Sequence, residues 1–166
     1  MVAPPILIRP ADEDDATTIG EVHRSSVETL CVSRYSVAQL EAWFEDRPPN
    51  MYLRAIREQR VWLATEAECV LGFLEIRPAE IEKLFVRPAA VHRGIGSALL
   101  HLGITRARSL APGAITALAL LNAQAFYERY GFTKVGESEI LRGRSQLSIK
   151  VVRMQLSSAL RPIAAA

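Results

Sequence analysis

The sequence is poor in cysteine and histidine: its 166 residues include two cysteines and three histidines. Cys31 and Cys69 form no short-spaced pair, and His23, His92 and His101 match no metal-ligand spacing. These absences argue against a disulfide framework and against a zinc site, and they favour the reducing cytoplasm as the location. We therefore expect the protein to hold no metal.

Long apolar runs and an excess of one charge are also lacking. No apolar run approaches the roughly 20 residues that span a bilayer, and the short run at the N-terminus lacks the basic region of an export signal. The formal net charge is +2, and acidic and basic residues alternate along the chain instead of forming a basic stripe. We therefore expect neither a membrane nor a nucleic acid as the main partner.

What the sequence contains is a succession of strand and helix patterns. Its length fits one domain, and no repeat, linker or low-complexity tract divides it. Strands are predicted at 6–9, 61–66, 69–76, 81–86, 115–121, 132–137 and 147–156. Helices are predicted after 12–15, after 36, after 96 and over 123–130. Segment 51–59 has an ambiguous pattern, for which a short helix is one interpretation. This order predicts the α/β class, with a mixed central sheet covered by helices on both faces, in a single domain over residues 1–166.

The most informative stretch joins the strand 81–86 to the helix after Gly96. Gly94 and Gly96 stand in the connecting loop, and Arg93 precedes them. The free N–H groups at the start of a helix make an anion site, and glycine lets the backbone approach the anion closely. A bound pyrophosphate is one interpretation; a tight turn that needs glycine is the other. The Walker pattern and the three-glycine dinucleotide fingerprint are both absent.

Two blocks resemble the GNAT family of N-acetyltransferases. Segment 81–100 is similar to the family's acetyl-CoA motif, whose core is Gln/Arg-x-x-Gly-x-Gly/Ala, although Val91 stands where Gln or Arg is usual. Segment 122–132, Asn-Ala-Gln-Ala-Phe-Tyr-Glu-Arg-Tyr-Gly-Phe, resembles the family's Asn-Ala-x-x-Phe-Tyr-Glu-x-x-Gly-Phe helix. The opening segment 8–14 also resembles the family's start. The resemblance covers about residues 6–156 and implies the GNAT-like acyl-CoA N-acyltransferase fold.

The resemblance implies that the protein moves an acetyl group from acetyl-CoA, its cosubstrate, directly to a primary amine. The pantetheine arm would lie in a gap between strands 81–86 and 115–121. Residues implied to contact the cofactor are Leu84, Phe85, Val86, Val91, His92, Arg93, Gly94, Ile95, Gly96, Ser97, Asn122 and Tyr127. Because the family's phosphate contacts are largely backbone N–H groups, Val91 is expected to weaken binding but not to abolish it.

Tyr127 matches the family's general acid. A phenol with a pKa of about 10 can protonate a thiolate whose parent thiol has a pKa of about 8.5. Asn122 is expected to cap the helix over 123–130 and to point, like Tyr127, at the cofactor sulfur. Packing beside Phe126 as an ordinary aromatic side chain is the alternative role for Tyr127.

Glu82 is our first candidate for the base that deprotonates the amine. It lies on the strand expected to contact the acetyl group, and strand alternation places it on the face of Leu84 and Val86. Glu75 and Glu80 are rivals at adjoining strand ends, and a solvated glutamate at the strand edge is the alternative.

Several other residues have weaker claims to a role. Cys31 is a candidate nucleophile without a partner histidine, and His92 is a candidate minor contact near the phosphates. His23 and His101 are expected on helix surfaces. Arg142 and Arg144 are expected between the last two strands, where they either border the acceptor site or belong to a solvated loop.

Two other classes of function compete with catalysis. One is a non-catalytic CoA-binding regulatory domain, and the other is an interaction module that forms a homodimer by sharing strands. The survival of both Tyr127 and Glu82 favours the enzyme. The sequence does not specify whether the acceptor is a small molecule or a protein amine, and it leaves a homodimer open.

Overall fold

The computed structural model describes residues 4–48 and 50–158, so the ends of the predicted domain lie outside the described residues. Its strands are β1 (Ile6–Pro10), β2 (Val61–Glu66), β3 (Cys69–Arg77), β4 (Glu80–Val86), β5 (Ile115–Leu120), β6 (Thr133–Arg142) and β7 (Leu147–Leu156). Its α-helices are α1 (Ala16–Leu30), α2 (Val37–Glu45), α3 (Leu53–Arg57), α4 (Ile95–Leu110) and α5 (Gln124–Arg129). Short 3-10 turns η1 (Glu13–Asp15), η2 (Pro88–Ala90) and η3 (Leu121–Ala123) precede α1, α4 and α5.

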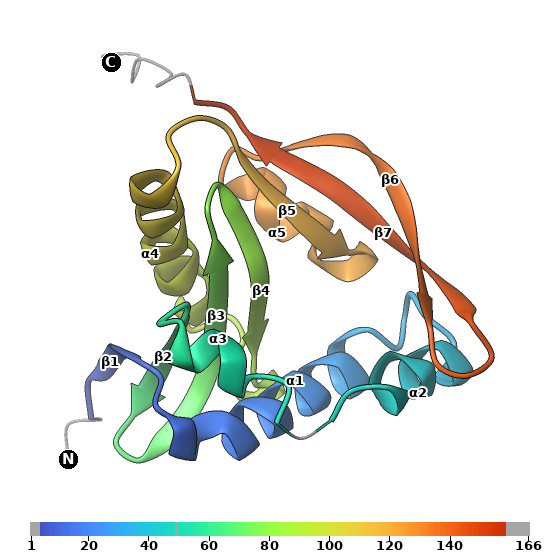
Figure 1. Cartoon of the computed structure of the whole chain (residues 1–166), viewed down its shortest axis with the longest axis horizontal. Helices are drawn as coiled ribbons and strands as arrows, with labels where there is room; N and C mark the ends of the chain where they lie inside the picture. Colours follow the sequence, from blue (N-terminus) through green and yellow to red (C-terminus); the bar gives the residue numbers. More distant parts are fainter. Residues whose placement is uncertain (1–3, 49, 159–166) are drawn as a thin grey trace.

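The seven strands form one mixed sheet, as predicted, in the order β1-β2-β3-β4-β5-β7-β6. Neighbouring strands are antiparallel except β4 and β5, which are parallel. These two strands pair only at Glu80 with Thr116 and at Ile81 with Ala117. Beyond these pairs the strands diverge (Figure 1). The sheet is therefore open at its centre.

Helices cover both faces of this sheet. Helices α1 and α3 pack on one face around a core that includes Ile19, Leu63 and Phe73, and α2 continues this layer against Ile149. Helices α4 and α5 pack on the other face, where Leu74 and Leu99 lie in the core. Among the described residues, no helix is both long enough and apolar enough to cross a membrane. The expected arrangement, a mixed sheet between two helical layers, is confirmed.

Strand β3 holds its neighbour β4 close along one side of this opening. Its residues from Val70 to Ile76 are all buried, because helices cover both of its faces. A Cβ at Gly72 would lie 2.9 Å from the carbonyl oxygen of Phe85 on β4. Only glycine therefore allows β3 and β4 to approach so closely, and β4 keeps a fixed position along one side of the opening.

Candidate active site

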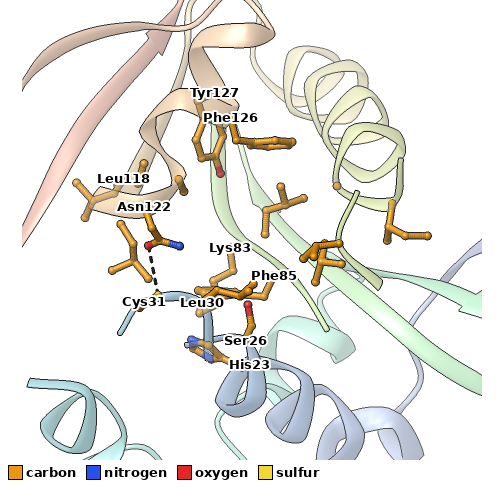
Figure 2. A pocket seen from close by; sticks show the side chains of 18 of the residues that line it. His23, Ser26, Leu30, Cys31, Lys83, Phe85, Leu118, Asn122, Phe126 and Tyr127 are labelled. Atoms are coloured by element: carbon orange, nitrogen blue, oxygen red, sulfur yellow. Dashed lines mark hydrogen bonds between the residues drawn. The ribbon is translucent and has the colours of Figure 1, made fainter. Parts of the chain in front are cut away.

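A cavity of about 580 Å³ occupies the opening between β4 and β5. Figure 2 shows Tyr127 and Phe126 on one side of it, His23 and Ser26 on the opposite side, and Lys83 between them. We refer to two walls, each defined by its lining residues. The α4–α5 wall consists of Val91, His92, Gly94, Ile95, Gly96, Ser97, Asn122, Phe126 and Tyr127. The α1–α2 wall consists of His23, Ser26, Cys31, Trp43, Arg47, Lys83 and Arg142.

The structure brings nearly all of the predicted cofactor residues to this one cavity. The predicted residues that line it are Leu84, Phe85, Val86, Val91, His92, Gly94, Ile95, Gly96, Ser97, Asn122 and Tyr127. Arg93 is the exception. It does not line the cavity, and its guanidinium lies 2.6 Å from the Glu66 carboxylate.

The start of α4 forms the mouth of the α4–α5 wall. Gly94 precedes the helix with φ +78°, a left-handed conformation that favours glycine. The first i→i−4 bond of the helix runs from the Ala98 N–H to the Gly94 carbonyl. The N–H groups of Ile95, Gly96 and Ser97 therefore precede the helical ladder and have no partner within it. Such a helix start attracts an anion.

Gly96 is needed for a different reason. A Cβ at this position would lie 3.3 Å from the ring of Phe126 on α5. Gly96 thus allows α4 and α5 to pack closely beside the cavity. The two glycines of the motif have separate tasks, one in the backbone turn and one in helix packing.

Tyr127 lies on α5 between the rings of Phe126 and Phe132. Its side chain is 5% exposed, and its hydroxyl points into the cavity in Figure 2. Burial raises the pKa of Tyr127 well above its usual range, because an apolar surrounding disfavours the phenolate. The phenol therefore keeps its proton throughout the neutral range.

Asn122 corrects one expectation. It lies within η3 and makes no capping bond to α5, whose N-cap residue is Ala123. Its side-chain oxygen instead accepts a hydrogen bond from the Cys31 thiol at 3.3 Å, across the cavity (Figure 2). Burial raises the pKa of the Cys31 thiol to about 11. At neutral pH Cys31 is thus a thiol and a poor nucleophile.

Glu82 lines the cavity, but not on the face that alternation predicts. The register between β3 and β4 shifts at this point, so that Glu75 pairs with Lys83 and Ile76 pairs with Ile81. Glu82 is the extra residue of this bulge, which breaks the alternation with Leu84 and Val86. Its carboxylate lies 3.5 Å from the Lys83 amine and 3.4 Å from the Arg77 guanidinium.

The two rival glutamates lie in different surroundings. Glu75 is 3% exposed, and its carboxylate lies 2.7 Å from both the Lys83 amine and the Arg60 guanidinium. Burial raises the pKa of Glu80. Neither of them lines the cavity, so Glu82 is the one candidate base among the three that does.

His23 also corrects an expectation, because it is buried and not on a helix surface. It is 0% exposed and lines the cavity from α1. Its Nε2 accepts a hydrogen bond from the Trp43 indole at 3.0 Å, and its Nδ1 lies 2.5 Å from the Tyr52 hydroxyl. Burial lowers the pKa of His23 well below its usual range. Neutral His23 can fill both of these hydrogen-bonding positions.

The sequence motifs did not indicate Trp43, Arg47 or Lys83, which line the α1–α2 wall. No local motif surrounds them. For His23, helical spacing was a usable signal, because Ile19 and Ser26 on the same face of α1 are buried too. Among the described residues, no group of three or more acidic, cysteine or histidine side chains could hold a metal.

Comparisons with known proteins agree with this fold. A family model described as an acetyltransferase (GNAT) domain matches residues 31–157. The peptidyl-lysine N-acetyltransferase YjaB of Salmonella typhimurium is 29% identical over 140 residues, covering 81% of this chain and 88% of that protein.

Two solved structures share the fold. A GCN5-related N-acetyltransferase from Rhodopseudomonas palustris matches with a TM-score of 0.86 at 24% identity, over 95% of this chain and 98% of that one. The PaiA N-acetyltransferase from Thermoplasma acidophilum, in complex with coenzyme A, matches with a TM-score of 0.72 at 21% identity, over 92% and 99%. With the family model matching most of its length, the chain belongs to the GNAT family of acetyl-CoA-dependent N-acetyltransferases.

Proposed function

We propose that acetyl-CoA binds in the cavity between β4 and β5 and that its acetyl group moves directly to a primary amine, with Tyr127 as general acid and Glu82 as general base. One observation carries the proposal. Tyr127 and Glu82 line the same cavity, at the place where β4 has lost its parallel partner.

The residues present fit acetyl-CoA. Beyond Ile81 the β5-facing edge of β4 has no strand partner, so the backbone of residues 84–86 is free to bind the amides of a pantetheine arm. The N–H groups of Ile95, Gly96 and Ser97 would hold the pyrophosphate. When bound there, acetyl-CoA supplies a thioester as the acetyl donor.

Tyr127 suits the role of the acid because its hydroxyl points into the cavity and carries a proton at neutral pH. It would give that proton to the leaving sulfur, and direct transfer then needs no acetylated intermediate on the protein. The nearby Cys31 does not suit a nucleophile's role, since its thiol pKa is about 11.

Glu82 suits the role of the base because it lines the cavity and its side chain is 24% exposed to water. An alkylammonium has a pKa of about 10.4, so it must lose a proton before it attacks the thioester. Glu82 would accept that proton through a water molecule. Glu75 is fully engaged by two cations and would instead hold Lys83 in place.

Other predictions stay open beside this proposal. The lysine side chain is one acceptor to test, because YjaB is named for peptidyl-lysine. A cytoplasmic location, a homodimer and a single domain over residues 1–166 stay predictions. Both cysteines are free, which suits a reducing compartment.

The test is release of CoA thiol when the protein meets acetyl-CoA and a panel of primary amines. We expect release that depends on an amine and matches the acetylated product mole for mole. Thermal stabilisation by CoA without any turnover would instead indicate a non-catalytic CoA-binding domain. If the protein shows neither turnover nor stabilisation by CoA, the interaction module is the one class of function that is left of the three.

A further inference from the structure

Two arginines of the α1–α2 wall, Arg47 and Arg142, both contact the indole ring of Trp43. The guanidinium carbon of Arg47, just beyond α2, lies 4.5 Å from the centre of the Trp43 ring. That of Arg142, at the end of β6, lies 5.5 Å from the same ring. All three side chains line the cavity. Segments far apart in the sequence thus bring two cations to one place.

Neither arginine has an anionic partner among the described residues. Arg47 feels Glu82 and Glu75 only at a distance. The Nε of Arg142 is buried without a hydrogen-bond partner, and its one side-chain bond is a long contact of 3.4 Å to the Leu141 carbonyl. Burial and the neighbouring Arg142 lower the pKa of Arg47 to about 10. Two cations that contact one indole ring, neither with an anionic partner among the described residues, form a site that an anion would stabilise.

The other charges of this wall are already matched. Lys83 is held by Glu75 at 2.7 Å and lies 3.5 Å from Glu82, and His23 is neutral. The unmatched positive charge therefore belongs to Arg47 and Arg142. It would repel a simple alkylammonium acceptor, but not an acceptor that also carries an anionic group.

The pyrophosphate of acetyl-CoA is not the natural occupant of this place. Its proposed site is the start of α4, which packs on one face of the sheet. Trp43 belongs to α2, in the helical layer on the other face. An anion at the two arginines would thus belong to the second substrate.

We infer that Arg47 and Arg142 form an oxyanion subsite for the acceptor, so that the preferred substrate is a primary amine that also carries a carboxylate or phosphate. This inference rests on the proposed function and adds the acceptor's chemical class. The planar guanidinium binds either oxyanion through paired N–H groups, and Trp43 fixes the orientation of both side chains.

The test compares acceptors that differ only in the anionic group. The first pair is 5-aminopentanoate and 5-aminopentan-1-ol, and the second is 2-aminoethyl phosphate and ethanolamine. The third pair consists of two dipeptide amides, acetyl-Glu-Lys and acetyl-Gln-Lys. It tests whether a carboxylate next to the lysine of a polypeptide acceptor raises kcat/KM. We expect kcat/KM for the anionic member of at least one pair to be roughly 10- to 100-fold higher, as for hydrogen bonds to charged groups.

Variants then assign that preference to the two arginines. Arg47→Gln and Arg142→Gln should each raise KM for the anionic amine and lower KM for the amine without the anionic group, because one of the two cations that repel it is gone. KM for acetyl-CoA should stay the same. Arg47→Lys keeps the charge but loses the paired N–H groups of the guanidinium. It should therefore retain part of the preference for the anionic amine that Arg47→Gln loses. Arg54→Gln is the matched control, because Arg54 is 87% exposed and pairs only with Glu58 on the surface.

Calorimetry gives a readout that does not depend on turnover. It measures the binding of 5-aminopentanoate to the CoA-saturated protein. Equal kcat/KM values within all three pairs would overturn the inference and leave the proposed function standing. A preference that survives both Gln substitutions in folded protein would overturn it as well. If no amine is acetylated at all, the proposed function fails and the inference fails with it.

Discussion

The two walls of the cavity are built by different means. The α4–α5 wall comes from two short sequence segments, 91–97 and 122–127, and offers mainly backbone N–H groups, glycine and a phenol. The α1–α2 wall comes from separate segments and offers side chains, among them His23, Trp43, Arg47 and Lys83. A cofactor that a whole family shares can be held by backbone, whereas a particular acceptor has to be selected by side chains. The sequence motifs therefore predict the residues of the α4–α5 wall, whereas they do not predict those of the α1–α2 wall.

The sharpest way to test the α4–α5 wall is Tyr127→Phe, which removes one hydroxyl and little volume. Because a general acid contributes roughly 10²- to 10⁴-fold, we expect kcat to fall by that factor with CoA affinity nearly intact. Steady-state kinetics and calorimetry with CoA check both parts. Tyr130→Phe, at the end of the same helix, is the control. Retention of most of kcat by Tyr127→Phe would make Tyr127 a packing residue.

Glu82→Gln tests the proposed general base, which lies in the bulge of β4. We expect kcat/KM at neutral pH to fall by about 10²-fold, and activity to return partly at high pH. The reason is that the free amine becomes abundant as its pKa of about 10.4 is approached. The measurement is the full pH profile of kcat/KM.

Glu80→Gln and Glu75→Gln are the controls, since neither side chain lines the cavity. If one of them loses the acidic limb of the profile while Glu82→Gln keeps it, the role belongs to that residue. If none of the three changes the profile, the amine enters already deprotonated and the enzyme acts by positioning alone.

Gly96→Ala tests whether the α4–α5 wall depends on close helix packing. The added methyl group would lie 3.3 Å from the Phe126 ring, so we expect this contact to offset the gain of about 1 kcal/mol that alanine brings to a helix. The free energy of unfolding should then be about 1–3 kcal/mol lower than in the Gly20→Ala variant. CoA affinity should fall too, because the N–H groups of α4 move with the helix. Gly20→Ala in α1 is the control, since its methyl group would meet only Tyr52 at 3.7 Å. Chemical denaturation and CoA titration of both variants decide the point, and equal behaviour would contradict it.

The smallest expected effect concerns His23 on the α1–α2 wall. Its pKa is lowered in the folded state from 6.5, so the unfolded chain binds its proton more readily. The contribution of neutral His23 to the free energy of unfolding is therefore complete above about pH 6.5 and is lost as the pH falls. The free energy of unfolding then changes by up to about 1.4 kcal/mol per pH unit. Denaturation between pH 7 and pH 5 should show a shallower slope for His23→Gln than for the wild type. The exposed His101→Gln should keep the wild-type slope.

The sequence was sufficient for the fold and for most of the α4–α5 wall. Apolar periodicity indicated the strands, and the Gly94–Gly96 segment indicated the helix start that lines the cavity, because both signals are local. The bulge at Glu82 was not predictable, since it depends on how β3 and β4 pair. The shared indole of Arg47 and Arg142 depends on contacts between α2 and β6, which no local pattern encodes.

The most direct test of the central claim, transfer from acetyl-CoA to the amine without an acetylated protein, is the intact mass of the protein during turnover. The protein is mixed with acetyl-CoA, with and without an acceptor amine, and quenched within single turnovers. We expect unmodified protein at every time and CoA thiol that appears only with the amine. An acetyl group that forms and decays on Cys31 at the rate of turnover would contradict direct transfer.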